Sequence, residues 1–304
     1  MDDTGVNRNG APREILPGVL VCADAEDVAR TAARRFVDWA WQAIARDGQF
    51  HAALSGGSTP LALYRLLASS EYRSQVDWPK VHLFWGDERA VPPDDPNSNY
   101  GATRRELLLR VPIPPNNVHR MEAEDPNIGR AAHNYEAVLR KYLPCDDRGF
   151  PIFHLVLLGM GADGHTASLF PGSRILRETS RWVSTPLVAK LGMRRVTLTL
   201  PVLEAARRIL FLVTGRDKAA TLREVLCDHP EPPLPAQLVQ PRNGERMFLI
   251  DEKAAALLEG CGTASDKTSA PSAASSAPTP PQPGLPESPA GKPLGEKPAG
   301  KKNT

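Results

Sequence analysis

The sequence predicts an α/β fold in a single domain, with a mostly parallel sheet and helices on both of its faces. Short apolar runs alternate with helix-like segments along most of the chain, an order that is typical of parallel sheets. The run 153–158 is apolar enough for a strand that is buried on both faces. Several of these runs end in polar or charged loops, as strands do where a ligand binds at the edge of a sheet.

Strands are expected at the apolar runs that turn residues bound: 19–22, 50–54, 81–85, 118–121, 153–158, 182–186, 195–200, 208–214 and 247–250. Helices are expected where apolar residues recur at helical spacing: 25–45, 61–68, 100–109, 127–142, 219–226 and 252–258. Asp24 is a suitable N-cap for the first helix, within which Trp39 and Trp41 are interpreted as packing residues. Thr166 is expected to start a short helix, and the alternation in 195–200 predicts a half-exposed strand.

Composition limits the classes of function. The chain has 304 residues, of which 41% are hydrophobic and 24% charged, so an ordinary core is expected. The net charge of +2 is too small to indicate nucleic acid or a membrane surface as a partner. Cys22, Cys145, Cys227 and Cys261 are scattered, which argues against a metal site and against a disulfide framework. No apolar leader or membrane-spanning run is present, so we expect a soluble, cytoplasmic protein.

The domain boundaries follow from the same composition. Residues 1–14 are polar and are expected to be flexible, while residues 15–262 are expected to form the α/β domain. Residues 263–304 are rich in Ala, Ser, Pro, Gly and Lys and contain no aromatic residue. Such a segment buries too little apolar surface to offset the entropy of ordering. We expect a disordered tail, interpreted as an inert extension rather than as a basic tether for an acidic partner.

A candidate anion cradle follows the second predicted strand. The loop Ser55–Pro60, SGGSTP, includes Gly56, Gly57 and Ser58 and leads directly into a helix. Its backbone N–H groups, its hydroxyls and the helix dipole together favour a bound phosphate. The loop matches neither the Walker A pattern nor the dinucleotide-binding pattern. A tight strand-to-helix turn with a Ser or Thr cap remains the alternative.

Asp163 and His165 lie on a glycine-rich turn that follows the run 153–158. Imidazole is the side chain that most readily exchanges a proton near neutral pH. A carboxylate two positions away is placed to fix the tautomer of the ring and to stabilise its charged form. The residues alone leave a second interpretation open, in which Asp163 caps a helix and His165 is an ordinary surface side chain.

Charged residues follow two other predicted strands. Asp87 and Arg89 come after the run 81–85, and Arg89 either pairs with a neighbouring carboxylate or faces a substrate anion. Lys218 lies at a predicted helix start, where a cation is disfavoured unless an anion binds beside it. Because the carboxyl ends of parallel strands meet at one edge, these groups predict a site for a small phosphorylated molecule that undergoes proton transfer. The sequence contains neither a GxSxG elbow nor a Cys–His pair, so it does not indicate a covalent intermediate.

Taken together, the motifs resemble the 6-phosphogluconolactonase family. They are SGGSTP at 55–60, WGDER at 85–89 followed by VP and SN, GMGADGHTASLFPG at 159–172, RRVTLTLPVL at 194–203 and GRDKA at 215–219. The resemblance covers about residues 15–260, and its blocks come in the family's order. It implies a Rossmann-like α/β fold and hydrolysis of 6-phosphoglucono-δ-lactone to 6-phosphogluconate in the oxidative pentose phosphate pathway. It also implies that no cofactor is needed.

The resemblance assigns roles to individual residues. His165 matches the family's general base and Asp163 its companion carboxylate. The phosphate loop corresponds to Gly56, Gly57 and Ser58, and the phosphate lysine to Lys218. The GDER block contributes Asp87 and Arg89 to substrate binding. The RRVT block contributes either Arg194 or Arg195, of which Arg195 aligns slightly better with the strand.

Two alternatives remain beside the lactonase. The first is a glucosamine-6-phosphate deaminase, whose family has a similar phosphate loop and lysine but a Glu five positions after the histidine. Phe170 occupies that position here and is unable to relay a proton. The second is a sugar-phosphate sensor without catalytic activity, which has no need of a base such as His165. The sequence leaves open whether the protein is a monomer or a homodimer.

Overall fold

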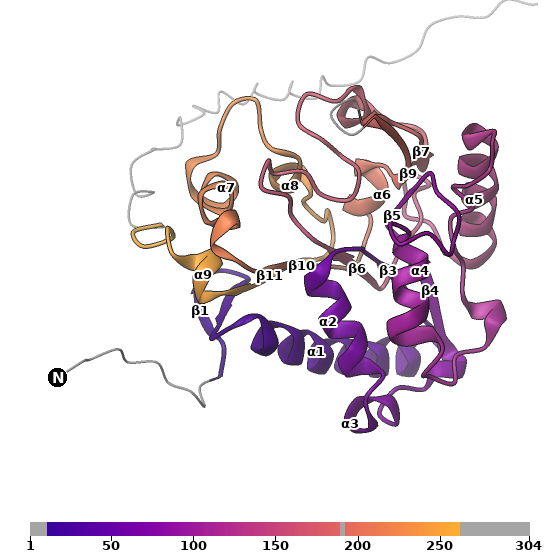
Figure 1. Ribbon diagram of the computed structural model, residues 1–304, viewed down its shortest axis with the longest axis horizontal. Coiled ribbons are helices and arrows are strands. Elements are labelled where there is room, and N and C mark those ends of the chain that lie inside the picture. The colour runs from indigo at the N-terminus through magenta and orange to yellow at the C-terminus, as the bar shows by residue number, and fades with distance from the viewer. Residues whose placement is uncertain (1–10, 189–191, 262–304) are drawn as a thin grey trace, which may run out of the picture. The chain divides into compact units, whose positions relative to one another are not determined.

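The computed structural model describes residues 11–188 and 192–261, which belong to one compact unit (Figure 1). They contain a seven-stranded sheet with the order β1-β2-β11-β10-β6-β3-β4. Neighbouring strands are parallel, except that β1 and β2 are antiparallel at one edge. The predicted α/β fold with a mostly parallel sheet is confirmed. The strands are β1 (Arg13–Leu16), β2 (Val19–Cys22), β3 (Phe50–Leu54), β4 (Val81–Trp85), β6 (Leu155–Leu158), β10 (Arg208–Val213) and β11 (Glu245–Asp251).

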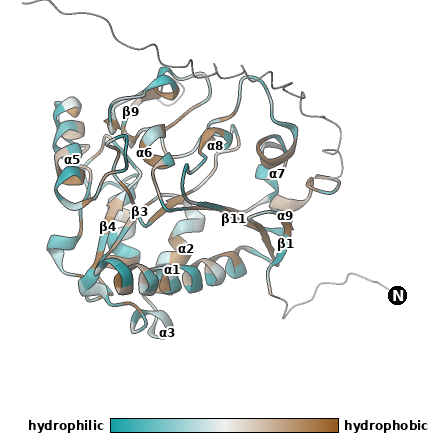
Figure 2. Cartoon of the chain, turned by 180° about the vertical axis from the view of Figure 1, so that it is seen from behind, coloured by the Kyte–Doolittle hydropathy of each residue, from teal (hydrophilic) through white to brown (hydrophobic). Residues whose placement is uncertain are grey.

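Helices cover both faces of this sheet, as predicted. Figure 1 shows α1 and α2 on one side and α7 and α8 on the other, and the opposite view in Figure 2 agrees. The hydrophobic colours in Figure 2 concentrate in the central strands, where the core lies. The helices are α1 (Ala25–Asp47), α2 (Ser58–Leu67), α3 (Ser70–Arg73), α4 (Asn99–Thr103), α5 (Ile128–Tyr142), α6 (Leu200–Glu204), α7 (Ala219–Arg223), α8 (Pro235–Leu238) and α9 (Glu252–Ala255).

The long helix α1 forms where the sequence predicts it. The Asp24 side chain accepts a hydrogen bond from Asp27 N at 2.9 Å, and the helix ends at Gly48, whose positive φ of 79° suits glycine. Trp39 on its inner face is buried, but Trp41 is 71% exposed. The interpretation of Trp41 as a packing residue was therefore wrong, because two residues along a helix lie on different faces.

A second, small antiparallel sheet lies beside the main one and was not predicted. It pairs β5 (Asp87–Arg89) and β7 (Val183–Ser184) with β9 (Met193–Leu198), which also pairs with β8 (Leu187–Val188). The prediction of a half-exposed strand at 195–200 was wrong, because β9 ends at Leu198 and its last residues are buried. The buried Thr197 hydroxyl hydrogen-bonds to Leu198 O at 3.0 Å, so its polarity does not require exposure.

Two local predictions also differ from the structure. No helix starts at Thr166, because its hydroxyl donates to Gly159 O at 2.8 Å and its backbone forms a β-bridge with Leu169. Ala167 within this turn has a left-handed φ of 47°. The predicted strand at 118–121 is reduced to one bridge between Val118 and Leu83.

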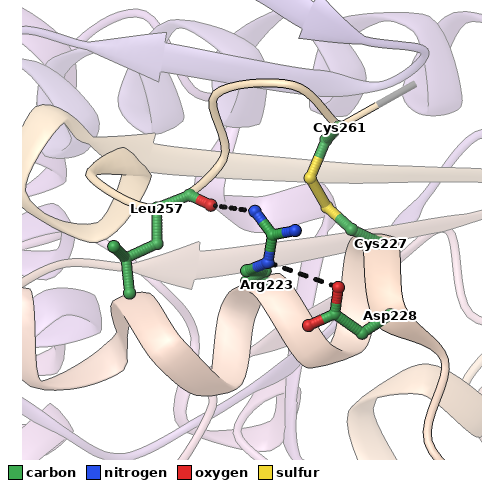
Figure 3. The surroundings of a disulfide bond; sticks show 5 residues. All are labelled: Arg223, Cys227, Asp228, Leu257 and Cys261. Atoms are coloured by element: carbon green, nitrogen blue, oxygen red, sulfur yellow. Dashed lines mark hydrogen bonds and ion pairs between the residues drawn. A yellow bond between two sulfur atoms is a disulfide. The ribbon is translucent and has the colours of Figure 1, made fainter. Parts of the chain in front are cut away.

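One disulfide is present, although the scattered cysteines argue against a disulfide framework. Cys227 and Cys261, 34 residues apart, form a disulfide with a Cα–Cα distance of 5.6 Å (Figure 3). Spacing along the chain gave no sign of it, because the pairing depends on α7 and α9 lying in contact. Nearby, Arg223 Nη1 donates to Leu257 O at 2.9 Å.

Two of the sequence predictions concern the chain termini. Most of the segment 1–14 and the whole tail 263–304 lie outside the described residues, so the flexible start and the disordered tail stay predictions. Arg13 and Glu14 pair with β2, so the boundary at residue 14 was wrong. None of the helices in the described part of the chain is both long and apolar enough to cross a membrane.

Candidate active site

A pocket of about 570 Å³ lies at the carboxyl ends of β3, β6 and β10, beside β5 and β9. This is the edge at which open α/β sheets bind ligands. Asp163 contacts His165 but lines a neighbouring pocket instead. The pocket is lined by most of the residues that the sequence singles out: Gly56, Gly57, Ser58, Asp87, Arg89, His165, Arg195 and Lys218.

The glycine loop enters the pocket between β3 and α2. Its two glycines are needed for different reasons. Gly57 has a φ of +105°, which other residues rarely adopt. A Cβ on Gly56 would overlap the side chain of Asn99. The buried Tyr64 hydroxyl fixes the start of the loop by donating to Ser55 O at 2.7 Å. The N-terminus of α2 is thus held at the pocket without a side-chain cap, a favourable arrangement for an anion.

His165 and Asp163 are in direct contact. The distance between His165 Nδ1 and Asp163 Oδ1 is 2.5 Å, and the same oxygen accepts the His165 backbone N–H at 3.2 Å. The Phe170 ring stacks on the imidazole with 4.3 Å between centroids. Because Nδ1 donates to the carboxylate, Nε2 is the ring nitrogen that is left to accept a proton.

Lys218 lies on a short 3₁₀ turn, Arg216–Lys218, between β10 and α7. Its Nζ is 3.0 Å from Asp217 Oδ2, and the Lys218 side chain is 24% exposed. The sequence predicted that the Lys218 charge is unfavourable at a helix start unless an anion lies beside it. In the structure the Asp217 carboxylate is that neighbouring anion. Thr59 and Thr214 join this region to the glycine loop through a hydroxyl–hydroxyl hydrogen bond of 2.8 Å.

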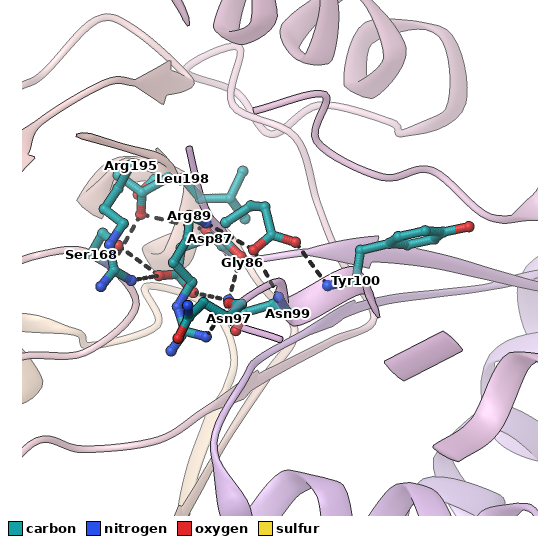
Figure 4. A network of polar contacts seen from close by, with 11 residues as sticks. Gly86, Asp87, Arg89, Asn97, Asn99, Tyr100, Ser168, Arg195 and Leu198 are labelled. Atoms are coloured by element: carbon teal, nitrogen blue, oxygen red, sulfur yellow. Dashed lines mark hydrogen bonds and ion pairs between the residues drawn. The ribbon is translucent and has the colours of Figure 1, made fainter. Parts of the chain in front are cut away.

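Asp87 joins two walls of the pocket (Figure 4). Its Oδ2 accepts the Ser168 hydroxyl at 2.6 Å and lies 3.8 Å from Arg195 Nη1. Ser168 belongs to the turn that carries His165, so Asp87 connects β5 to that turn. Burial lowers the pKa of the Arg195 guanidinium, although Asp87 opposes this effect. Arg195 lines the pocket whereas Arg194 is exposed, so the geometry favours Arg195 as the site arginine.

Asn99 is a pocket residue to which sequence reasoning gave no role. It is 2% exposed, and its Nδ2 donates to Asp87 O at 2.9 Å. The only signal was its place in the SN pair of the family block. Buried polar atoms in the wall have no hydrogen-bond partner among the described residues: Ser55 Oγ, Arg89 Nε, Asn99 Oδ1 and Arg195 Nε. Such atoms are rare in protein interiors, and a bound ligand or water would satisfy those that face the pocket.

The described side chains give no indication of a metal centre. Within residues 11–188 and 192–261, no group of three or more His, Cys, Asp or Glu side chains is arranged to hold a metal ion. What the pocket offers instead is an imidazole that contacts a carboxylate outside it, a glycine loop at a helix start, one lysine and two arginines. These groups suit a phosphorylated substrate and proton transfer.

Comparisons with known proteins agree with this chemistry. The model of the family described as glucosamine-6-phosphate isomerases/6-phosphogluconolactonase matches residues 23–248. The chain is 41% identical over 214 residues to the 6-phosphogluconolactonase of Synechocystis sp., covering 70% of this chain and 86% of that protein. It is 44% identical over 213 residues to the human 6-phosphogluconolactonase, covering 69% and 81%. The solved structure of 6-phosphogluconolactonase from Trypanosoma brucei has a TM-score of 0.73 at 30% identity, covering 81% of this chain and 100% of that one.

The motifs, the parallel sheet and the pocket at its carboxyl edge thus coincide with a family match over most of the described residues. The chain belongs to the family of glucosamine-6-phosphate isomerases and 6-phosphogluconolactonases.

Proposed function

We propose that this protein hydrolyses 6-phosphoglucono-δ-lactone to 6-phosphogluconate, the lactonase step of the oxidative pentose phosphate pathway. The observation that carries the proposal is one pocket lined both by His165, whose Nδ1 contacts Asp163, and by a phosphate-type loop with Lys218. The relatives named above are lactonases of this kind. The reaction consumes water and no oxidant or reductant, so it balances without a cofactor.

The phosphate would occupy the end of the pocket formed by Gly56, Gly57, Ser58 and Lys218. The helix start and the lysine charge both favour a dianion there. Arg89 and Arg195 lie on the wall formed by β5 and β9, where they would face the polar oxygens of the sugar acid. Fixing the phosphate at one end places the lactone carbonyl near His165, and this positioning supplies much of the rate.

His165 would act as the general base. Asp163 holds Nδ1–H, so Nε2 takes a proton from water as the water oxygen attacks the lactone carbonyl. The tetrahedral intermediate then collapses, the bond from the carbonyl carbon to the ring oxygen breaks, and Nε2 returns the proton to that oxygen. Lactone and water become a hydroxy acid, and no covalent bond to the protein forms.

The deaminase is the second candidate, since the family model includes it. Its family's proton relay needs a carboxylate where this chain has Phe170, whose ring stacks on His165 instead. An apolar ring in this place favours the lactonase. A sensor without activity is disfavoured, because the His165–Asp163 pair would have no role in it.

The test is turnover of freshly prepared 6-phosphogluconolactone, with glucosamine 6-phosphate assayed beside it. We expect 6-phosphogluconate from the first and no ammonia from the second. Ammonia release without lactone turnover would contradict the lactonase and support the deaminase. Binding without turnover of either compound would favour the sensor. We also propose a cytoplasmic location, which fractionation of the source cells would test.

Lys218 provides a sharper test of how the substrate is held. A charge-assisted contact is worth roughly 1.5–3 kcal/mol, so Lys218→Ala should lower kcat/KM by about ten- to a hundredfold, mainly through KM. Lys253 on α9 is exposed and does not line the pocket, so Lys253→Ala is a matched control. Unphosphorylated gluconolactone should be hydrolysed equally by Lys218→Ala and the parent. Equal slowing on both lactones would contradict the assignment of Lys218 to the phosphate.

A further inference from the structure

Glu88 is a buried carboxylate to which the proposed mechanism gives no role. It lies in β5 between two pocket residues, Asp87 and Arg89, and is 2% exposed. Alternate side chains of a strand point to opposite faces, and Glu88 is absent from the pocket lining. Burial raises the pKa of its carboxyl, against the effect of three backbone N–H groups that bind it. A carboxylate held in this way is costly unless its hydrogen bonds are satisfied.

Both carboxylate oxygens bind the segment at the start of α4. Oε1 accepts Asn99 N at 2.8 Å, and it also accepts Arg89 N at 2.8 Å. Oε2 accepts Tyr100 N at 2.7 Å and the Ser98 hydroxyl at 3.1 Å. Ser98 is itself the N-cap of α4, since its hydroxyl accepts Gly101 N. Negative charge at a helix start is favourable, so Glu88 ties α4 to β5.

The hydrogen bonds between Glu88 and the start of α4 fix residues that form the pocket wall. Arg89 Nη1 donates to Asn97 O at 2.6 Å, so the guanidinium is held by the residue just before Ser98. Asn99 Nδ2 donates to Asp87 O, and its Oδ1 faces Gly56 of the phosphate loop. Figure 4 shows Arg89, Asn97 and Asn99 gathered beside Asp87 and Arg195, with the Tyr100 ring pointing away from them.

We propose that Glu88 is a positioning residue that acts through the Asn97–Asn99 segment to hold Arg89 against the substrate. The inference rests on the proposed function and extends it to a residue that never touches the substrate. Arg89 is the group through which the effect passes, because its guanidinium and its backbone N–H are both held by this network.

The variant that tests this is Glu88→Gln, which keeps the size and shape of the side chain. An amide offers one acceptor oxygen and one NH₂ group, so either Tyr100 N or the pair Arg89 N and Asn99 N loses its acceptor. We expect kcat/KM for the phosphorylated lactone to fall about ten- to a hundredfold, the usual effect of losing hydrogen bonds to a charged group. KM should change more than kcat.

Glu178 supplies a matched control. Its Oε1 accepts Thr179 N, Ser180 N, the Ser180 hydroxyl and Arg181 N at 2.9–3.1 Å, yet it does not line the pocket. Glu178→Gln makes the same chemical change in an equally bonded carboxylate, and kcat/KM should stay within about twofold, since it loses no pocket contact. If both variants lower kcat/KM alike, Glu88 has no special link to the site.

A double-mutant cycle with Arg89→Ala separates positioning from a general effect on the fold. If Glu88 acts through Arg89, Glu88→Gln should change kcat/KM little once Arg89 is gone. Additive losses would overturn the proposal, as would unchanged kinetics in a folded Glu88→Gln protein. Should Glu88→Gln fail to fold, Ser98→Ala removes one of the same hydrogen bonds and should give a smaller loss with the same dependence on Arg89. Parent turnover is measured in parallel, so failure of the lactonase proposal is recognised by an inactive parent.

Discussion

The two ends of the central sheet use histidine in opposite ways. At the carboxyl ends of the strands, His165 lies in an open pocket with its side chain 32% exposed and a carboxylate at Nδ1. At the amino ends, a histidine cluster is packed into the interior: His51, His82, His119 and His154. His51 and His82 are the second residues of β3 and β4, and His154 directly precedes β6. The same residue type therefore faces a hollow at one end and fills the core at the other.

Both ring stacking and hydrogen bonds hold the histidine cluster, including one hydrogen bond of 3.0 Å between His82 Nδ1 and His119 Nε2. His51 stacks on His154 and His82 on His119, with ring centroids 5.2 and 5.3 Å apart. His154 Nε2 donates to Asp47 at 2.9 Å, since its Nδ1 accepts His51 N. Neither ring nitrogen of His51 has a partner among the described residues. Burial lowers the pKa of His51 to about 3 and that of His119 to about 4, so both rings are neutral at neutral pH.

This difference shows that a histidine takes its role from burial and partner rather than from its presence in the sequence. Loss of the exposed ring should affect chemistry, and loss of a buried ring should affect stability. The predictions for His165 and His51 that follow test this separation.

The largest effect is expected from His165→Asn. The variant keeps a polar side chain but removes the base, so kcat should fall by about 10²–10⁴-fold while KM changes little. The midpoint of thermal unfolding should stay near that of the parent, because the ring is partly exposed. Steady-state kinetics and a melting curve check both points. Near-normal kcat in His165→Asn would contradict the role of His165 as the base and would favour its interpretation as an ordinary surface residue.

The histidine cluster should make the fold sensitive to acid. The pKa of His51 is about 3 in the folded protein and 6.5 as the ordinary value, so between these pH values the unfolded chain binds a proton that the folded chain does not. Stability is therefore lost as pH falls below 6.5, by up to about 1.4 kcal/mol per pH unit for each such group. Neighbouring charges also act on this ring: His82, His119 and His154 lower its pKa, and Asp47 raises it.

His51→Leu removes this group and two unpartnered nitrogens, so it should cost little at pH 7. The slope of the unfolding free energy between pH 6.5 and 4, measured by denaturant titration, should become smaller than in the parent. His133 on α5 is exposed, so His133→Leu should leave the slope unchanged. An unaltered slope in His51→Leu would mean that the buried ring does not govern acid stability.

The sequence predicted the polar loops better than the buried polar residues. The parallel sheet was readable because apolar runs such as 155–158 end abruptly at glycines, and strand order then brings those ends together. His51 and His82 went unnoticed, because a histidine inside an apolar run leaves no periodic signal. Asn99 was missed for a different reason: its place in the pocket depends on a contact with Glu88, 11 residues away along the chain.

The disulfide and the second sheet were unpredictable on the same grounds. Cys227 and Cys261 meet only because the segments around α7 and α9 pack together. In the second sheet, Asp87 pairs with Thr197, which lies 110 residues further along the chain. Local pattern carries no information on such pairings, and β5 itself is a run of three charged residues, DER, without an apolar pattern.

The smallest effect is expected where charges are exposed. Lys218 Nζ lies 3.0 Å from Asp217 Oδ2, and the Asp217 side chain is 68% exposed. The Lys218 side chain lowers the pKa of Asp217 by hydrogen bonding to it. An exposed pair of this kind contributes about 0.2–1 kcal/mol. If a substrate phosphate binds Lys218, it must displace Asp217 or share the lysine with it.

Asp217→Asn should therefore tighten phosphate binding rather than weaken it. Removing the competing carboxylate should lower KM for the phosphorylated lactone by about two- to fivefold at low salt, and less at high salt because exposed charges are screened. Asp228, which pairs with Arg223 at 3.3 Å outside the pocket, provides the control, and Asp228→Asn should not change KM. A higher KM in Asp217→Asn would mean that Asp217 orients Lys218 instead of competing for it. In that case the pair resembles His165 and Asp163, where the carboxylate prepares its partner for the substrate.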